Sequence, residues 1–109
     1  MQSAAAAKDR IFQALADPSR RAIFESLTRG EVAVKDLTAR FDISQPAVSQ
    51  HLATLKAAGL VKGRREGRCV YYRVAPRGMK PLIDWIAHYR AFLAEHVGRL
   101  EQLLEKMDR

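Results

Sequence analysis

Short polar side chains gather near the start of one amphipathic segment in the middle of the chain. At about 100° per residue, a helix from Ser44 to Ala58 directs Val48, Leu52 and Leu55 toward a core. The opposite face carries short or amide side chains: Gln45, Pro46, Ser49, Gln50 and Ala53. Amides can bond adenine in a bidentate way, hydroxyls can bond base edges or phosphates, and free N–H groups at a helix start favour a phosphate. This pattern predicts a helix that reads duplex DNA, with an ordinary solvated outer face as the alternative.

Positive charge is concentrated directly after this segment. From Lys56 to Lys80 the chain has eight basic residues and one acid, Glu66, a net charge of +7. The remaining eleven basic and eleven acidic residues cancel. A field of one sign beside a candidate reading helix is typical of a DNA-binding protein, because phosphates attract it without regard to sequence.

The basic residues fall largely on two strand-like runs, 60–65 and 68–74, which Glu66-Gly67 joins into a hairpin. Arg64, Arg65 and Arg68 flank its tip, where they can reach backbone phosphates or the minor groove. The alternative is a solvated charged turn, but like charges crowded on a small tip repel one another and favour a polyanion partner. Lys56, at the end of the reading helix, is a further expected DNA contact. His51 lies at the edge of the apolar face, and we expect it to pack or to contact phosphate rather than to bind metal.

The elements around these features follow from local signals. Helices are expected over 8–16, 18–29, about 35–41, 44–58 and about 79–109, with a brief strand at 32–34. Asp17 and Ser44 can cap helices, Pro18 suits a first helical position, and glycines at 30 and 59 end helices. This order is that of a winged helix-turn-helix domain, a mainly α fold with a small β-hairpin wing that dimerises through its terminal helices. We therefore expect a flexible tail at 1–7 that either frays or extends the first helix, a DNA-binding domain at 8–78 and a dimerisation helix at 79–109.

Length and composition bound the other possibilities. A chain of 109 residues suits one domain with a modest core. No run approaches the ~20 apolar residues of a membrane span, so we expect no membrane partner. The single cysteine, Cys69, cannot form an internal disulfide, which fits the reducing cytoplasm. Nearby basic residues could make it redox-active, although its strand position also suits a small apolar side chain.

Three segments resemble one known family. The runs ALADPSRRAIFESL (14–27), SQPAVSQHLATLKAAGLV (44–61) and GRCVYYRV (67–74) are similar to the ArsR/SmtB winged-helix repressors of bacteria. The resemblance implies a homodimer in the cytoplasm that binds a palindromic operator and often represses its own operon. It also implies a DNA-reading role for Ser44, Gln45, Pro46, Ser49, Gln50 and His51.

The chain departs from the metal-sensing members of that family. Where some carry a Cys-Val-Cys motif, this sequence has Ala33 and Lys35. Where others bind metal through the last helix, the positions counted from Asp84 hold Ile86, Val97 and Leu100, none of which is a ligand. His88 and His96 are eight residues apart, about 80° around a helix, so they do not converge within one chain. We expect no metal site, no cofactor and an unidentified signal.

The last helix carries an apolar seam at alternating spacings of four and three, interrupted by Arg90. Its expected dimer contacts are Ile83, Ile86, Leu93, Val97, Leu100 and Leu104. A second stripe of Leu82, Trp85, Tyr89, Phe92 and His96 covers an adjacent face. One stripe is expected to pack on its own domain and the other on a second subunit, which would place two reading helices about 34–36 Å apart. The alternative is that both stripes belong to one core.

Other functional classes explain the sequence less well. The chain has no nucleophile elbow, phosphate loop or HExxH motif, so we expect no enzyme. A protein-interaction module built on the last helix, with non-specific nucleic-acid affinity, is the main alternative. It leaves the basic wing without a purpose. Structured RNA is a weaker fit, because side chains cannot read its narrow major groove.

Overall fold

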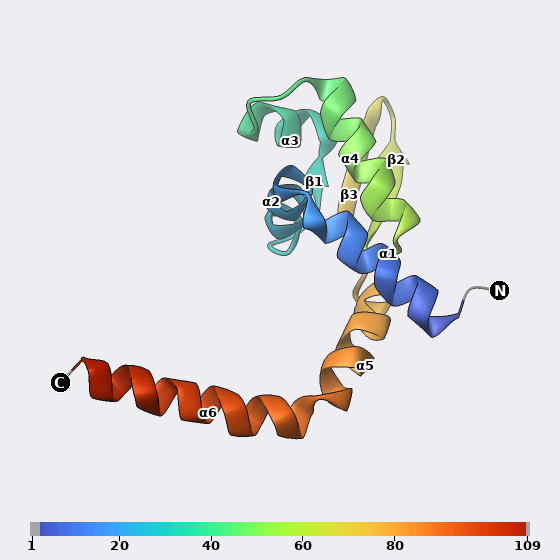
Figure 1. Ribbon diagram of the computed structural model, residues 1–109. Coiled ribbons are helices and arrows are strands. Elements are labelled where there is room, and N and C mark those ends of the chain that lie inside the picture. The colour runs from blue at the N-terminus through green and yellow to red at the C-terminus, as the bar shows by residue number, and fades with distance from the viewer. Residues whose placement is uncertain (1–2, 109) are drawn as a thin grey trace.

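The structure is a computed structural model that describes residues 3–108. Its helices are α1 (Ala4–Ala16), α2 (Pro18–Leu27), α3 (Val34–Arg40), α4 (Gln45–Ala57), α5 (Lys80–His88) and α6 (Arg90–Met107). The strands are β1 (Val32–Ala33), β2 (Val61–Glu66) and β3 (Cys69–Val74), and a 3₁₀ helix, η1 (Pro76–Met79), follows β3. The first four helices cluster with the small sheet, whereas α6 extends away from them (Figure 1). The predicted winged helix-turn-helix fold is confirmed.

Two helix starts are capped as the sequence predicts. The Asp17 carboxylate accepts hydrogen bonds from the backbone N–H groups of Ser19 (2.8 Å) and Arg20 (3.1 Å), and Pro18 occupies the first position of α2. The hydrogen bond from the Arg20 N–H is the main cause that lowers the pKa of Asp17. The Ser44 hydroxyl accepts from the Ala47 N–H at the start of α4 (3.3 Å). These caps satisfy N–H groups that a helix cannot pair internally.

One apolar core joins the helices to the sheet. Its fully buried side chains come from α1, α2, α3, α4 and the start of β2, and they include Ile11, Ile23, Leu37, Leu52, Leu55 and Val61. Phe24 and Phe41 pack on this core but are only partly buried. Phe12 of α1 is 40% exposed and meets Trp85 of α5 edge to face, with ring centroids 5.3 Å apart. Leu82 of α5 packs on the core directly, and the aromatic pair adds a contact between α1 and α5 outside it.

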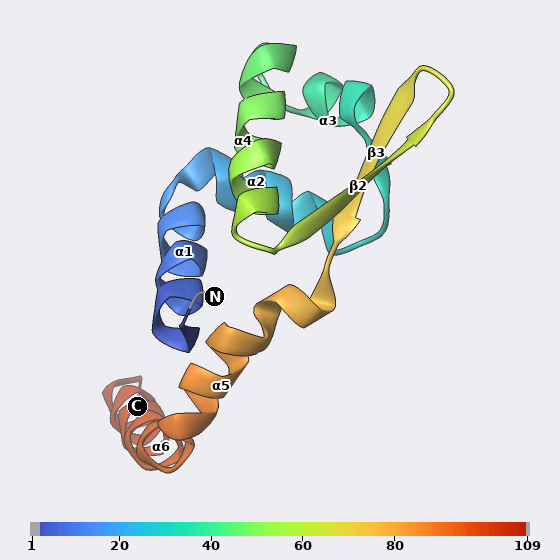
Figure 2. The same cartoon turned by 90° about the vertical axis from the view of Figure 1, so that its right-hand side faces the viewer.

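The sheet has three strands in the order β1-β3-β2, all antiparallel. Glu66 pairs with Cys69, so the loop is Gly67-Arg68 and not the expected Glu66-Gly67. Of the two loop residues only Gly67 has a positive φ (+62°), the pattern of a type II′ turn, which matches the strand twist. Figure 2 shows this hairpin projecting from the domain as a wing. The brief β1 strand was expected, but its pairing with β3 was not.

Two helices differ from their expected bounds. The first helix begins at Ala4, capped by the Ser3 hydroxyl, so residues 4–7 of the expected tail are helical. Residues 1 and 2 of that prediction lie outside the described part of the chain. The last helix is not continuous, because it breaks at Tyr89 (φ −104°, ψ 14°), and α5 and α6 run in different directions (Figure 1). The single straight seam expected along this helix is consequently divided in two.

The end of α4 and the start of η1 touch through backbone alone. Gly59, which ends α4, has φ +81°, a conformation that glycine adopts at little cost. A Cβ atom added at Gly78 would lie 1.5 Å from the carbonyl oxygen of Gly59. Gly78 is thus required for close approach rather than for its own φ.

Replacing Gly78 with Ala should destabilise the domain. The two backbone segments would have to separate, and overpacking of this kind costs about 1–3 kcal/mol of unfolding free energy. Urea unfolding followed by circular dichroism measures the loss. Gly98→Ala is the matched control, since a Cβ there meets nothing within 4 Å and Ala is favoured over Gly inside a helix by about 0.5–1 kcal/mol. Equal stability of the Gly78→Ala variant and the parent would show that the contact is absent in solution.

Candidate nucleic-acid interface

The two faces of α4 differ completely in exposure. Val48, Leu52 and Leu55 are all 0% exposed and belong to the core. Most of the residues predicted to read DNA lie exposed on the other side, at or near the N-terminus of the helix: Ser44, Gln45, Pro46, Ser49 and Gln50. A side chain must be free at one face of a helix to enter a major groove, and this arrangement meets that requirement.

Part of this outer face adjoins the wing. Gln45 and Ser49 of α4, Arg68 and Cys69 of the wing, and Lys35 of α3 line one cleft of about 270 Å³. The cleft brings amide, hydroxyl and basic groups from three elements together. Lys35 was not among the predicted site residues, because the sequence alone does not place the first turn of α3 beside the hairpin. Cys69 is a half-buried free thiol at the cleft, where its redox role stays a prediction.

His51 and Lys56 occupy different environments on α4. Lys56 is exposed in the last turn. His51 is half-buried, and its Nδ1 atom is buried without a hydrogen-bond partner in the described chain. A half-buried ring is consistent with the expected packing role, and a phosphate contact by His51 stays a prediction.

Arg64 of the wing is engaged inside the molecule. Its Nε donates to both carboxylate oxygens of Glu31 at 2.9 Å, and its Nη2 lies 2.6 Å from Glu31 Oε1. Its Nη1 donates to Glu66 at 2.9 Å, and the guanidinium stacks 4.6 Å from the ring centre of Tyr71. Two carboxylates and an aromatic face surround this one cation. A phosphate would have to compete with these partners for the guanidinium, and contact of Arg64 with DNA stays a prediction.

The electrostatics of this group follow from the same geometry. The hydrogen bond from Arg64 is the main cause that lowers the pKa of Glu31, while desolvation opposes it. The same bond raises the pKa of Arg64. Because the carboxylate pKa is depressed, the ion pair is complete at neutral pH and is lost only as acid protonates Glu31. Glu31 directly precedes β1, so the pair ties the wing to the rest of the domain.

Arg65 and Arg68 differ from Arg64. Both are exposed, and neither forms an ion pair with any residue between Ser3 and Asp108. Like charges close together on a hairpin tip repel one another unless an anion lies between or beside them. Arg64 therefore acts as an internal brace that holds the wing through Glu31, whereas Arg65 and Arg68 form a free basic tip.

Among the described residues there is neither a cluster that could hold a metal ion nor a helix that could span a membrane. No three His, Cys, Asp or Glu side chains within residues 3–108 come together in a way that could hold a metal ion. None of the described helices has the length and apolar content needed to cross a membrane.

Known proteins resemble this chain in sequence and structure. Residues 17–62 match the model of a family described as bacterial regulatory protein, arsR family. The chain is 32% identical over 81 residues to the transcriptional repressor SdpR of Bacillus subtilis, covering 74% of this chain and 90% of that protein. It is 49% identical over 74 residues to the HTH-type transcriptional regulator Rv2034 of Mycobacterium tuberculosis, covering 68% of this chain and 69% of that protein. A solved ArsR-like transcriptional regulator from Rhodococcus sp. RHA1 matches with a TM-score of 0.70 and 26% identity, covering 90% of this chain and 92% of that chain.

Replacing Gln45 and Ser49 together with Ala should reduce sequence-specific binding. Each good base contact contributes about 1–3 kcal/mol of discrimination, so affinity for a specific duplex should fall at least tenfold while affinity for shuffled DNA changes little. Fluorescence anisotropy on both duplexes measures the ratio. Gln13→Ala, on the exposed face of α1, is the control. Equal loss on the two duplexes would refute base reading by this pair.

Substitutions in the wing should separate phosphate contacts from the brace. Arg65→Ala and Arg68→Ala should each reduce the slope of log affinity against log salt by about 0.9, one phosphate contact each. Arg64→Ala should change that slope much less, because its cation already faces Glu31 and Glu66. A salt series on one duplex gives all three slopes. A decrease of about 0.9 in the slope for Arg64→Ala would show that Arg64 also contacts a phosphate.

Proposed function

The chain belongs to the arsR family of bacterial regulatory proteins, and on that premise we propose that it is a homodimeric repressor that binds a palindromic operator. That it is a DNA-binding transcriptional regulator, and not an enzyme, follows from the family. The observation that carries the DNA-contact part of the proposal is the convergence of Gln45 and Ser49 with Arg68 at one exposed cleft. Base-reading and phosphate-binding groups then face the same duplex.

The proposed route to DNA binding uses both elements of the interface. The N-terminal part of α4 enters a major groove, where Gln45, Ser49 and Gln50 meet base edges. Arg65 and Arg68 at the wing tip neutralise phosphates beside that groove, and Lys35 adds a charge from α3. Phosphate contacts set register and base contacts set sequence preference. An occupied operator blocks transcription, and we propose that the operator lies upstream of the protein's own gene, in the bacterial cytoplasm.

The apolar surface of the C-terminal helices supports a dimer. No described residue of α5 or α6 is buried, and the predicted contacts Ile83, Leu93 and Leu100 are 56%, 40% and 54% exposed. Exposed apolar side chains in a continuous band mark an interaction surface. The spacing of four and three continues through α6 from Leu93 to Met107, as in helices that pack against a partner helix. A second copy can cover α6 even though the break at Tyr89 divides the seam.

We propose that this regulator does not sense metal at either of the two positions described above, the Cys-Val-Cys position or the last helix. Ala33, Ile86, Val97 and Leu100 offer no nitrogen, oxygen or sulfur ligand. Zinc and nickel need three or four such ligands at converging positions. The inducing signal is then of another kind.

The function is tested by titrating the purified protein with its own upstream DNA and with a shuffled duplex, with and without zinc. We expect tight binding to the upstream duplex alone, unaffected by zinc. Leu100→Glu should give a monomer in sedimentation velocity, because a carboxylate would be buried in the seam, and operator affinity should fall roughly 100-fold as two linked half-site contacts become one.

Gln102→Glu adds the same charge to the same helix on the face away from the seam and should leave both properties unchanged. Equal binding of the two duplexes would contradict an operator upstream of the gene. Release of DNA by zinc would contradict the proposal on metals, and a Leu100→Glu variant that stays dimeric would contradict the α6 seam.

A further inference from the structure

A second cleft lies between the C-terminal ends of α2 and α3, with the segment that enters β1 along one wall. Its volume is about 680 Å³, and its lining includes Ser26, Arg29, Val32, Arg40 and Phe41. It shares no lining residue with the cleft at the reading helix. Nothing in the proposed contact with DNA uses it.

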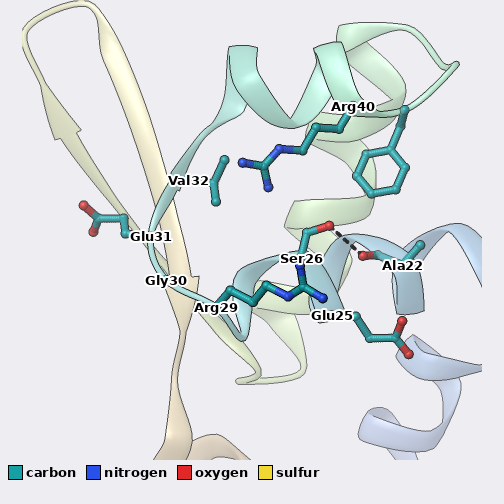
Figure 3. Close-up of a pocket in the computed structure, with 9 residues that line it drawn as sticks. Ala22, Glu25, Ser26, Arg29, Gly30, Glu31, Val32 and Arg40 are labelled. Carbon is teal, nitrogen blue, oxygen red and sulfur yellow. Dashed lines mark hydrogen bonds between the residues drawn. The ribbon is translucent and has the colours of Figure 1, made fainter.

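Two guanidinium groups face this cleft. Figure 3 shows Arg40 reaching in from α3 and Arg29 reaching in beside Ser26 from the end of α2. Neither guanidinium forms an ion pair or a hydrogen bond with any residue from 3 to 108, and both residues are exposed. Basic residues are common at the ends of helices, where they can donate to unpaired carbonyls. These two do not do so, so helix termination does not account for their orientation.

The acidic residues of the cleft do not neutralise the two arginines. In Figure 3 the carboxylates of Glu25 and Glu31 both point away from the opening. Glu31 is held on the outer side by Arg64, at 2.6 Å. The cleft therefore carries two positive charges without an ion-pair partner in the described chain, and one of its two carboxylates, Glu31, is held by the wing.

The rest of the lining defines what kind of anion would fit. Val32 and Phe41 are partly buried and pack on the core, which leaves an apolar wall beside the guanidinium groups. The Ser26 hydroxyl donates to the Ala22 carbonyl at 3.0 Å, so it has no hydrogen to offer an anion. Planar guanidinium groups match carboxylates and phosphates in a bidentate manner. The chemistry favours one acidic group joined to a short apolar portion.

We propose that this cleft is an effector site for a small organic anion bearing a carboxylate or phosphate group. The acidic group lies between Arg29 and Arg40, and the apolar portion rests on Val32 and Phe41. The proposal that the anion binds rests only on the geometry of the cleft. The proposal that the anion changes DNA binding also rests on the proposed function.

A short path joins this cleft to the wing. Glu31 lines the cleft and holds Arg64 of β2, and Val32, next in the chain, pairs with Tyr72 of β3. A ligand that draws the ends of α2 and α3 together acts on this segment and so on the wing. Because coupling between two ligands is reciprocal, the anion must change operator affinity by the same factor by which operator changes affinity for the anion.

The test uses the full-length protein, free and bound to its upstream duplex, titrated with benzoate, phenyl phosphate and inorganic phosphate by NMR of the backbone amides. We expect the two organic anions to shift the Gly30, Val32 and Phe41 signals, with inorganic phosphate binding more weakly. Benzamide, which has the ring without the charge, should not bind. Arg40→Gln should weaken binding about tenfold or more, since a charged hydrogen-bond partner is lost. The affinity of the Arg40→Lys variant for the organic anions should lie between those of the parent and the Arg40→Gln variant.

Arg10→Gln, an exposed charge on α1, is the matched control and should bind as the parent does. No binding of either organic anion, or equal binding by the Arg40→Gln variant, would overturn the site. Binding that leaves operator affinity unchanged would overturn the effector role. Failure to bind any operator would instead contradict the proposed function, and the anion titration of the free protein would remain interpretable.

Discussion

Burial of one face of α4 determines how the protein can meet another molecule. Val48, Leu52 and Leu55 have no exposed surface, and each such side chain stabilises the fold by about 1.5–3 kcal/mol. Turning the helix enough to hide Gln45 and Ser49 would expose all three, a cost larger than a few polar contacts could offset. The same burial anchors β2, because Leu60 and Val61 enter the core just after the helix ends. The orientation of the reading helix and the origin of the wing thus depend on one apolar contact.

Local signals predicted local structure well. The caps at Asp17 and Ser44, the turn at Gly67 and the faces of α4 depend on residues only a few positions apart, and their rules operate within that range. The break at Tyr89 had no glycine or proline to mark it, and its only sign in the sequence was Arg90, which interrupts the apolar seam. The pairing of Arg64 with Glu31 joins residues 33 positions apart. Only the fold brings them together, so the sequence showed a cluster of arginines but not which of them was already paired.

That pairing changes how charge on the wing should be understood. Counting residues assigns the hairpin a large positive field, whereas the structure pairs Arg64 with two carboxylates and leaves Arg65 and Arg68 without an ion-pair partner in the described chain. Binding to arbitrary DNA depends on the number of phosphates neutralised, so the pairing of Arg64 limits non-specific affinity while it keeps the hairpin in place. The same Glu31 carboxylate borders the second cleft, where it pairs with Arg64 and not with Arg29 or Arg40. One acidic residue therefore influences both surfaces.

The contact between Gly59 and Gly78 also has a mechanical consequence. Side chains in most contacts can change rotamer and absorb a small displacement, but here two backbones meet with no side chain between them. Close-packed interiors transmit strain, and a contact without adjustable parts transmits it with the least loss. In the proposed dimer, a shift of α5 against its neighbours would reach the end of α4 directly. The joint would then link the arrangement of the two subunits to the spacing of their α4 helices.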